Sequence, residues 1–391
     1  MNALSATLPR HLASACLAAL TLAGCGGGAG GGSSSTPPVA VTPTPTPAQP
    51  TRLHPVVIAG ASTQNNGGDF ADGSAGNARF SSITGLALDK AGNIYVADAG
   101  NCAVRKVTPA GIVSTLAGTG HCEAWDDSTQ PADGLGPAAR FYQLGRITID
   151  ADGNLYVNDR AEIRKITPSG NVSTLAGIFR SGEPSLDGSG SGARFQGILD
   201  LAAAPNGTLT VVDYTRGNLL GGGTQSACTL PNGYNTLREV SPQGVVTTLP
   251  GSSADCDAAK AAAPLTQASA ARFDKAGTLW FLHLQTLARR PAGGAAMIVT
   301  DASGQPVTNT LPQGGMEIAP DDAGNLYYRI GTTITKLDAS GKRTDVVSSQ
   351  ANAPAEINPD MALDGMSNLT FIGNHDFLVS VNNQIVKLTL K

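Results

Sequence analysis

The sequence repeats one pattern six times between residues 56 and 391, and this repeat constrains the fold more than any other feature of the chain. Its two clearest copies are GLALDKAGNIYVADAGNCAVRKVTPAGIVSTLAG and RITIDADGNLYVNDRAEIRKITPSGNVSTLAG. Repeats of this kind form one supersecondary unit each, and neighbouring units bury a shared core. The six copies lie at 85–118, 146–177 and 200–251, and around 274–283, 321–330 and 363–373.

Each copy predicts four short β-strands joined by tight turns. An Asp-x-x-Gly-Asn turn, as at 89–93, separates the first two strands. There the glycine tolerates a positive φ, and the aspartate can accept hydrogen bonds from the turn amides. Pro and Gly at 108–111 favour the turn before the fourth strand. The predicted fold class is therefore all-β, a six-bladed β-propeller of four-stranded antiparallel blades.

The two ends of the repeat region predict how the propeller closes. The last copy ends at QIVKLTLK (384–391), which matches a third strand and lacks a fourth. The missing strand is found at the other end of the region, where HPVVIAG (54–60) matches the fourth-strand sequence IVSTLAG. We therefore expect strand 54–60 to complete the last blade, which removes open sheet edges and joins the two ends of the domain.

These repeats resemble the NHL-repeat family over residues 56–391, most clearly in the first two copies. Where the family often has Asn-His-Leu, this chain has Asn101-Cys102-Ala103, so no role of that histidine carries over. The resemblance implies a propeller that acts by interaction rather than by catalysis.

The N-terminal segment is typical of a bacterial lipoprotein. Arg10 precedes an apolar stretch at 12–24 that is too short to span a bilayer. Leu22-Ala23-Gly24-Cys25 resembles the lipobox, whose cysteine carries a diacylglycerol. An ordinary cleaved signal peptide is the alternative. The resemblance implies a protein anchored by lipid in the cell envelope, at the outer membrane, facing either the periplasm or the cell surface.

We therefore predict three parts of the chain. Residues 1–24 are the signal peptide, and residues 25–52 are the lipidated Cys25 followed by a tether. Glycine and serine make the first half of this tether flexible, and Thr-Pro repeats make its second half extended. Residues 53–391 form the propeller.

Four cysteines lie in the predicted propeller. Their even number and the oxidising compartment predict disulfides, and three connectivities are possible. Cys102 and Cys122 lie in two loops of the first blade, and Cys228 and Cys256 occupy the same two loops of the third. Because these loops share one face of a propeller, we expect the pairs 102–122 and 228–256.

A second motif precedes each of the first three blades, at 72–80, 133–141 and 187–195, and ends in Ala-Arg-Phe. We expect its Phe to pack between blades and its Arg to bind loop carbonyls. A calcium site is the alternative, but too few carboxylates converge locally. We expect Asp98, and its counterparts at the ends of the next two second strands, to bind amides of the loop that follows.

One column of residues indicates a ligand site. It begins each innermost strand, eight residues before the turn asparagine or its equivalent, and would surround the mouth of the central channel. Its carboxylates and arginine, with Arg272 two residues further along one blade, could hold a polar ligand or a divalent cation such as Ca²⁺. Gluconolactonase-like propellers, which are similar in gross architecture, bind metal in this region. The alternative is a solvated polar mouth in which Arg146 is partly paired. The column reads Gly85, Arg146, Asp200, Ala270, Glu317 and Asp360.

Two histidines are isolated acid–base candidates. His283 ends a second strand, and His375 precedes Asp376 in what we predict to be the corresponding loop of the last blade. An isolated histidine is more often structural, and no Ser-His-Asp arrangement follows from the sequence.

Composition and missing motifs narrow the function. The net charge is −4 and no basic stripe occurs, so no nucleic-acid partner is expected. The sequence contains no HExxH, CxxC, G-x-S-x-G or Walker motif. We therefore expect a monomeric binding or scaffold module that needs no cofactor, with a protein or glycan ligand at its loop-rich face. The alternatives are a metal-dependent lactonase or lyase, using Asp200, Glu317 and Asp360, and a purely structural envelope protein.

Overall fold

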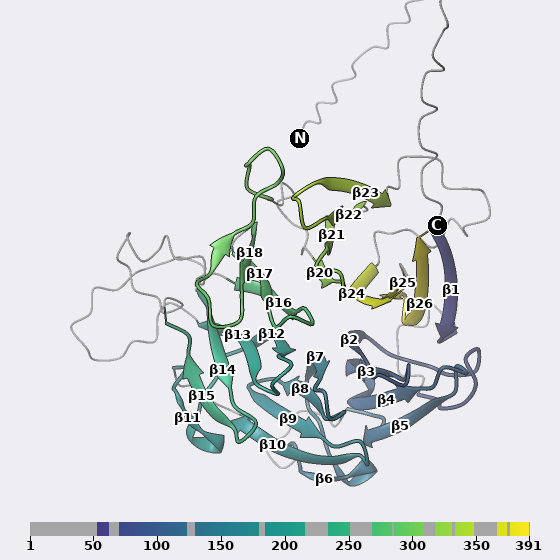
Figure 1. The fold of residues 1–391 in the computed structure, drawn as a ribbon. Coiled ribbons are helices and arrows are strands. Elements are labelled where there is room, and N and C mark those ends of the chain that lie inside the picture. The colour runs from purple at the N-terminus through teal and green to yellow at the C-terminus, as the bar shows by residue number, and fades with distance from the viewer. Residues whose placement is uncertain are drawn as a thin grey trace, which may run out of the picture. The chain divides into compact units, whose positions relative to one another are not determined.

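The chain forms six antiparallel sheets arranged as a six-bladed β-propeller (Figure 1). No helix in the described part of the chain is long and apolar enough to cross a membrane. The computed structural model describes residues 53–61, 70–122, 130–179, 184–215, 234–250, 268–283, 285–308, 317–330, 333–347, 366–373 and 376–390.

The first three blades each run from an innermost to an outer strand in chain order. Blade 1 consists of β2 (Ile83–Leu88), β3 (Ile94–Asp98), β4 (Ala103–Val107) and β5 (Val113–Gly118). Blade 2 consists of β7 (Leu144–Ile149), β8 (Leu155–Asp159), β9 (Glu162–Ile166) and β10 (Asn171–Gly177), with the short β6 (Gly134–Leu135) outside β10. Blade 3 consists of β12 (Ile198–Ala203), β13 (Leu209–Thr215), β14 (Tyr234–Val240) and β15 (Val245–Thr248), with β11 (Gly188–Ser189) outside β15.

The last three blades have four strands each among the described residues. Blade 4 consists of β16 (Ala268–Phe273), β17 (Leu279–His283), β18 (Thr286–Arg290) and β19 (Met297–Ile298). Blade 5 consists of β20 (Glu317–Pro320), β21 (Leu326–Ile330), β22 (Thr333–Leu337) and β23 (Arg343–Val347). Blade 6 consists of β24 (Met366–Gly373), β25 (Asp376–Val381), β26 (Gln384–Leu390) and β1 (Leu53–Ala59).

The innermost strands close into a ring. Each of β2, β7, β12, β16, β20 and β24 contacts the next, and β24 contacts β2 again. The apolar core of the described residues lies between the blades, as six clusters with one at each blade interface. Each blade buries both of its faces in this way, which explains why the repeated strands are apolar on both faces.

The predicted closure is confirmed. Strand β1 pairs antiparallel with β26, with Leu53 opposite Leu390 and Val57 opposite Val386. The first described strand therefore completes the last blade, and the two ends of the propeller lie side by side (Figure 1).

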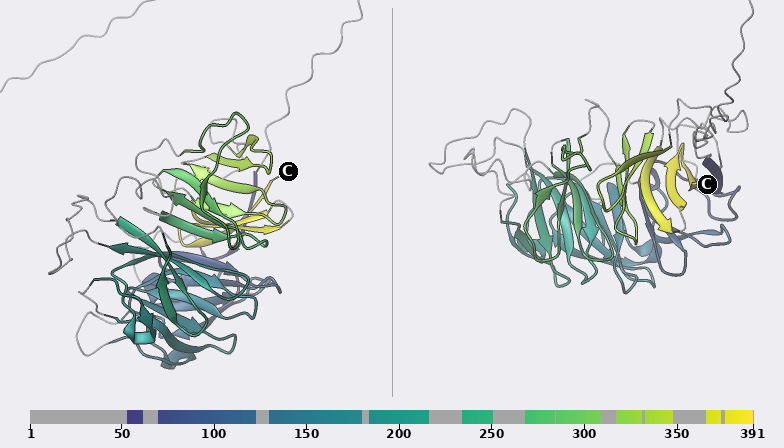
Figure 2. Two further views of the ribbon diagram at one scale, coloured as in Figure 1. Left: turned by 60° about the vertical axis from the view of Figure 1, so that its left-hand side comes forward. Right: turned by 45° about the horizontal axis from the view of Figure 1, so that its top comes forward.

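The Asp-x-x-Gly-Asn turns form as predicted. In blade 1, Asp89 Oδ1 accepts hydrogen bonds from the amides of Ala91 and Asn93, at 2.9 and 2.8 Å. Gly92 has φ +82°, a conformation that glycine adopts without strain. These turns and the Pro-Gly turns between third and fourth strands lie at one end of the blades, which is at the bottom in the right-hand view of Figure 2.

The segments that precede blades 1 to 3 run along the outer strand of the blade that follows them. The predicted packing of their phenylalanines is confirmed, since Phe80, Phe141 and Phe195 lie in the clusters between blades. In the first segment Arg79 Nη1 donates to the carbonyls of Asn77 and Ala78, at 2.9 and 3.1 Å, as expected.

An ion-pair cluster around a buried arginine, which we call the arginine clasp, ties each of these segments to its blade. In blade 1, Arg105 Nη1 donates to Asp98 Oδ2 over 2.9 Å, and Nη2 donates to Asp72 Oδ1 and Ala71 O. The side chains of Arg105 and Asp98 are fully buried, and the guanidinium lies 5.2 Å from the ring centre of Phe80. The equivalent clasps are Arg164 with Asp133 and Asp159, and Arg238 with Asp187 and Asp213.

The clasp corrects our prediction for the aspartates that end the second strands. Asp98 Oδ1 accepts the amide of Ser81, which precedes the innermost strand, rather than an amide of the following loop. From that loop it receives a side-chain donor, Asn101 Nδ2, at 2.9 Å. Burial raises the pKa of Asp98, while Asn101, the Ser81 amide and Arg105 oppose the rise. The prediction failed because the preceding segment, far from Asp98 in sequence, reaches it only in the folded blade.

The predicted register of the last blade is also wrong. We expected 363–368 to contain its first turn, which placed Asn368 in that turn and 369–373 in the second strand. In the structure Met366–Gly373 is the innermost strand, and the second strand is Asp376–Val381. The second strand therefore begins after the position of His375, which lies outside the described residues, rather than before it. The prediction failed because this copy diverges so far from the others that its turn sequence is not recognisable.

Candidate ligand-binding site at the channel mouth

A hollow of about 330 Å³ lies where the innermost strands of blades 1, 2, 3 and 6 begin. Because β2 begins opposite the end of β3, this is the end of the blades away from the tight turns. We call it the ligand face. The lining residues are Ile83, Thr84, Gly145, Arg146, Asn158, Ile198, Leu199, Ser367 and Asn368.

Arg146 is the charged residue of this lining. Its Nη1 donates to Asn368 Oδ1 over 2.6 Å and to the carbonyl of Thr84 over 3.2 Å. These bonds run from blade 2 to blades 6 and 1 and hold the guanidinium in place. Nη2 and Nε form no hydrogen bond with any described residue, so two donors of a positioned guanidinium remain available.

Irregularities in the innermost strands place the polar side chains of the hollow. Strand β7 has a register shift between Leu144 and Ile147, at which the Arg146 amide donates to Asn158 Oδ1 over 2.6 Å. Strand β24 has one between Ser367 and Thr370, and Asn368 there has φ +63°. Such bulges redirect a side chain out of the regular alternation, and here they direct polar groups to the channel.

The two predicted carboxylates that the structure describes, Asp200 and Glu317, do not converge on the hollow. Asp200 lies in blade 3, where its Oδ2 accepts Arg272 Nη1 at 2.8 Å and the amide of Ala271 at 3.1 Å, both from blade 4. Glu317 of blade 5 accepts the backbone amides of Asn368 and Leu369 in blade 6. Both carboxylates therefore link neighbouring blades.

These contacts bear on the metal hypothesis. Asp200 and Glu317 are not among the residues lining the hollow, and Arg272 is directed to Asp200. Within the described ranges no group of three or more His, Cys, Asp or Glu side chains could hold a metal ion. Asp360, the third predicted carboxylate, lies outside the described residues, and so does His375. His283 ends β17 opposite Ala268 and does not line the hollow.

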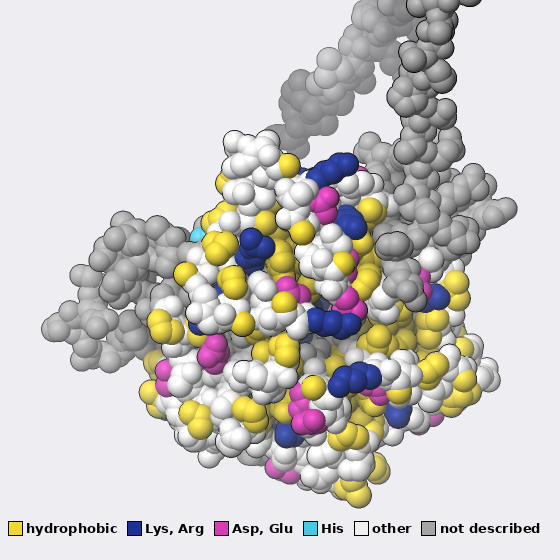
Figure 3. Space-filling view, viewed as in Figure 1, with side chains coloured by type: hydrophobic (Ala, Val, Ile, Leu, Met, Phe, Trp, Pro, Cys, Tyr) yellow, Lys and Arg dark blue, Asp and Glu magenta, His cyan; other side chains and the backbone are white. Residues whose placement is uncertain are grey.

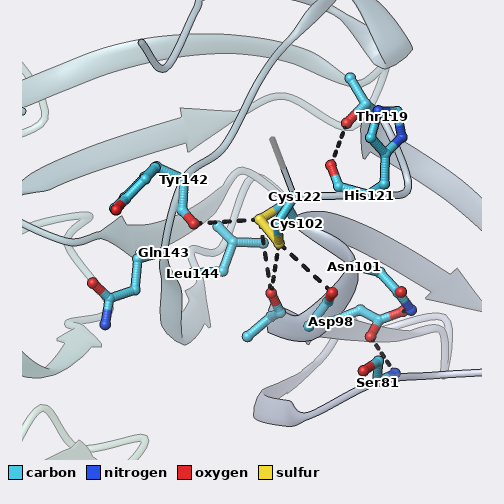
Figure 4. Close-up of a disulfide and its surroundings, with 12 residues drawn as sticks. Ser81, Asp98, Asn101, Cys102, Thr119, His121, Cys122, Tyr142, Gln143 and Leu144 are labelled. Carbon is cyan, nitrogen blue, oxygen red and sulfur yellow. Dashed lines mark hydrogen bonds between the residues drawn. A yellow bond between two sulfur atoms is a disulfide. The ribbon is translucent and has the colours of Figure 1, made fainter. Parts of the chain in front are cut away.

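The predicted disulfide of blade 1 is present at the ligand face (Figure 4). Cys102 and Cys122 are bonded, with 5.0 Å between their Cα atoms. Cys102 is fully buried, and its Sγ lies 3.3 Å from the carbonyl oxygen of Tyr142, a contact with the chain that enters blade 2. The disulfide therefore ties together two loops of blade 1, and Cys102 packs against the start of blade 2. Cys228 and Cys256 lie outside the described residues.

Glu162 is a titratable group that the sequence analysis did not single out. It begins the third strand of blade 2 and is 8% exposed. Burial raises the pKa of its carboxyl to about 7; Arg164 opposes that rise and Asp159 adds to it. An acidic residue in the first position of a buried strand was the available signal, since the same position of blade 1 is Ala103.

Sequence reasoning also missed Asn158 and Asn368, the two amides that position Arg146. Asn158 could have been noticed, because it is a polar residue in the buried second strand of blade 2, where blade 1 has Ala97. Asn368 was assigned to a turn by the wrong register, so its place at the channel was not foreseen.

The fold and this hollow define a six-bladed propeller with a polar channel mouth. Residues 80–107, which cover most of blade 1, match the NHL repeat. A search of curated protein sequences found no match.

Solved structures with the same fold have little sequence in common with this chain. An auxiliary nutrient binding protein from Bacteroides thetaiotaomicron is 12% identical, with a TM-score of 0.53 over 86% of this chain and 76% of that one. An auxiliary nutrient binding protein from Bacteroides ovatus is 12% identical, with a TM-score of 0.52 over 87% and 77%. A structural genomics protein of unknown function from Bacteroides thetaiotaomicron is 13% identical, with a TM-score of 0.54 over 87% and 76%. At such identities the similarity concerns the fold alone.

Proposed function

We propose that this protein is a binding module of the bacterial cell envelope, which a lipid on Cys25 anchors to the membrane and which binds a protein or glycan at its ligand face. The observation that carries the proposal is the hollow with Arg146, a positioned cation with donors to spare. A concave site with a few convergent polar groups is the ordinary form of a ligand site.

The two faces of the propeller support this choice of surface. The opposite face carries short turns such as 89–93 and 108–112. Longer connections, such as 216–233 and 348–365, leave from strand ends at the ligand face, as does the disulfide-bonded loop of Cys102. Binding residues concentrate in loops that a rigid scaffold positions. The nutrient binding proteins of the same fold are compatible with this role, although at their low identity they do not establish it.

Figure 3 shows the face of the short turns, where Lys and Arg lie among Asp and Glu rather than in a field of one sign. One such pair is Lys275 with Asp322, which joins blades 4 and 5. We assign no ligand to this face.

The alternative function is a metal-dependent lactonase or lyase, and it needs carboxylates free to bind a metal. Asp200 and Glu317 are instead held by donors of neighbouring blades. Thermal unfolding with and without millimolar Ca²⁺, Mn²⁺ or Zn²⁺ tests it. We expect no shift in Tm, and a shift that Asp200→Ala and Glu317→Ala abolish would favour the enzyme.

The binding function is tested with two matched substitutions on the full-length protein. Leu199→Glu alters the ligand face and Ile112→Glu the opposite face, at side chains that are 44% and 47% exposed. Each variant and the wild type are measured for binding to an array of envelope glycans and to envelope protein extracts. We expect Leu199→Glu to lose binding and Ile112→Glu to retain it; equal loss or no binding would contradict the proposal.

The proposed anchor is tested separately. We expect Cys25→Ala to release the protein from the membrane fraction and to abolish incorporation of labelled palmitate. Membrane association that survives this substitution would contradict lipidation at Cys25.

A further inference from the structure

We propose that the hollow at the channel mouth binds the carboxylate of a small organic acid, with Arg146 as its anchor. This inference rests on the proposed binding function and names the ligand class. It begins from a difference between Arg146 and four arginines that lie within or between blades: Arg105, Arg164, Arg238 and Arg272 each pair with at least one carboxylate. Arg146, in contrast, bonds only to a carbonyl and an amide oxygen within the described part of the chain.

The neighbours of Arg146 position it without neutralising it. Asn368 is itself held in place. Its side-chain Nδ2 donates to Ser380 Oγ over 2.8 Å, and its backbone N–H donates to Glu317 Oε1 over 2.9 Å. Its Oδ1 is thereby aimed at Arg146 Nη1. A guanidinium fixed through one nitrogen, with Nη2 and Nε available, presents two adjacent donors. This fork matches the two oxygens of a carboxylate.

Asp200 and Glu317, the two predicted channel acids that lie in the described part of the chain, are directed away from the hollow. The carboxylate of Asp200 is compensated by Arg272, and its side chain is 3% exposed. Glu317 is turned to the backbone amides of Asn368 and Leu369. Neither is part of the lining, so the charge that the lining contributes is that of Arg146.

The other residues that line the hollow indicate the size and the polarity of the acid that would bind there. Ile83, Ile198 and Leu199 contribute apolar surface beside the guanidinium. The volume of about 330 Å³ is near the lower end of the usual range for small-molecule sites. We therefore infer a small acid whose carbon skeleton contacts the aliphatic side chains while its carboxylate is bound by Arg146.

Isothermal titration calorimetry with full-length protein tests the inference, using benzoate and glucuronate as acids and benzamide and glucose as their uncharged analogues. We expect at least one acid to bind and its analogue not to bind. Arg146→Gln should abolish binding, and Arg146→Lys should weaken it by about tenfold, because lysine keeps the charge but lacks the fork. Arg289→Gln, which removes a cation outside the hollow, should leave the affinity unchanged.

A second variant tests the site independently of how Arg146 variants fold. Leu199 is 44% exposed, so Leu199→Glu should be tolerated while it places a competing carboxylate at the hollow. We expect this variant to lose the acid. Equal binding of acid and analogue, binding retained by Arg146→Gln, or no binding of either acid at millimolar concentration would overturn the inference. If glycans or envelope proteins still bind the ligand face in that case, the proposed function stands and only the ligand class is wrong.

Discussion

Blades 1 to 3 have an arginine at one buried position of the repeat, whereas blades 4 to 6 have an uncharged residue there. The middle of the third strand holds Arg105, Arg164 and Arg238 in the first half of the ring, and Ala288, Thr335 and Val386 in the second. All six side chains are buried. The same backbone therefore accepts a charged or an uncharged residue here, provided that its partners match.

The residues around this position also differ between blades 1 to 3 and blades 4 to 6. In blades 1 to 3 an aspartate lies at or near the end of the second strand and another belongs to the preceding segment, so the arginine is paired on both sides. Blade 4 has His283 where blade 1 has Asp98, and blade 6 has Val381. A buried ion pair adds little net stability over apolar packing, but its loss on one side is costly. The arginine clasp thus makes each of the first three blades depend on the segment that precedes it.

The largest effect should follow from breaking one clasp. Arg105→Ala leaves Asp98 buried without its cation, and we expect a loss of about 3–5 kcal/mol in the free energy of unfolding. Thr335→Ala at the equivalent position of blade 5 should cost only about 1 kcal/mol, because it removes one hydrogen bond to Asp345. Urea unfolding compares the two, and similar losses would refute the difference between the halves.

The disulfide distinguishes two blades that both contain a clasp. Cys102 and Cys122 close a loop with a sequence separation of 20, whereas blade 2 has Ala161 in the corresponding loop. Replacing both cysteines by serine should reduce stability by about 3 kcal/mol in the chain-entropy model. The measurement is thermal unfolding of the double variant and of wild type under non-reducing conditions. An unchanged Tm would show that the clasp alone holds this end of blade 1.

Glu162 makes the stability of blade 2 depend on pH. The pKa of its carboxyl is raised from 4.5 to about 7, so between these values the folded protein keeps a proton that the unfolded chain releases. Stability should therefore fall as the pH rises through this window, and the cost is complete above pH 7. We expect Glu162→Gln to stabilise the protein by about 2 kcal/mol at alkaline pH and to have little effect at acidic pH. Urea titrations at both pH values test this, and a pH-independent effect would contradict it.

The smallest effect concerns the exposed ion pair between blades 4 and 5. Lys275 and Asp322 are both more than half exposed, so Lys275→Ala should change the free energy of unfolding by less than about 1 kcal/mol. A loss as large as that of Arg105→Ala would mean that the second half of the ring depends on charges as the first half does. The same urea assay decides between these outcomes.

Local sequence was sufficient for most of the fold and for part of the site. The Asp-x-x-Gly-Asn turns, the strand that closes the ring and the bond between Cys102 and Cys122 were all predicted, because each depends on short-range pattern or on repeat position. Six residues were predicted to bind a ligand or metal, and of the five that the structure describes, Arg146 alone lines the hollow. The sequence could not show that Asp200 and Glu317 would be engaged across blade boundaries, since their partners lie in the next copy of the repeat.

The sequence by itself determined the number of blades, their strand order and the way in which the ring closes. Those properties follow from the turn sequences and from short apolar strands, which recur within each repeat. Only the tertiary structure decided which polar groups are compensated and which stay available. Ring closure brings Asn368 of blade 6 to Arg146 of blade 2. Two residues 222 positions apart in the sequence thereby form the positioned guanidinium on which the proposed function depends.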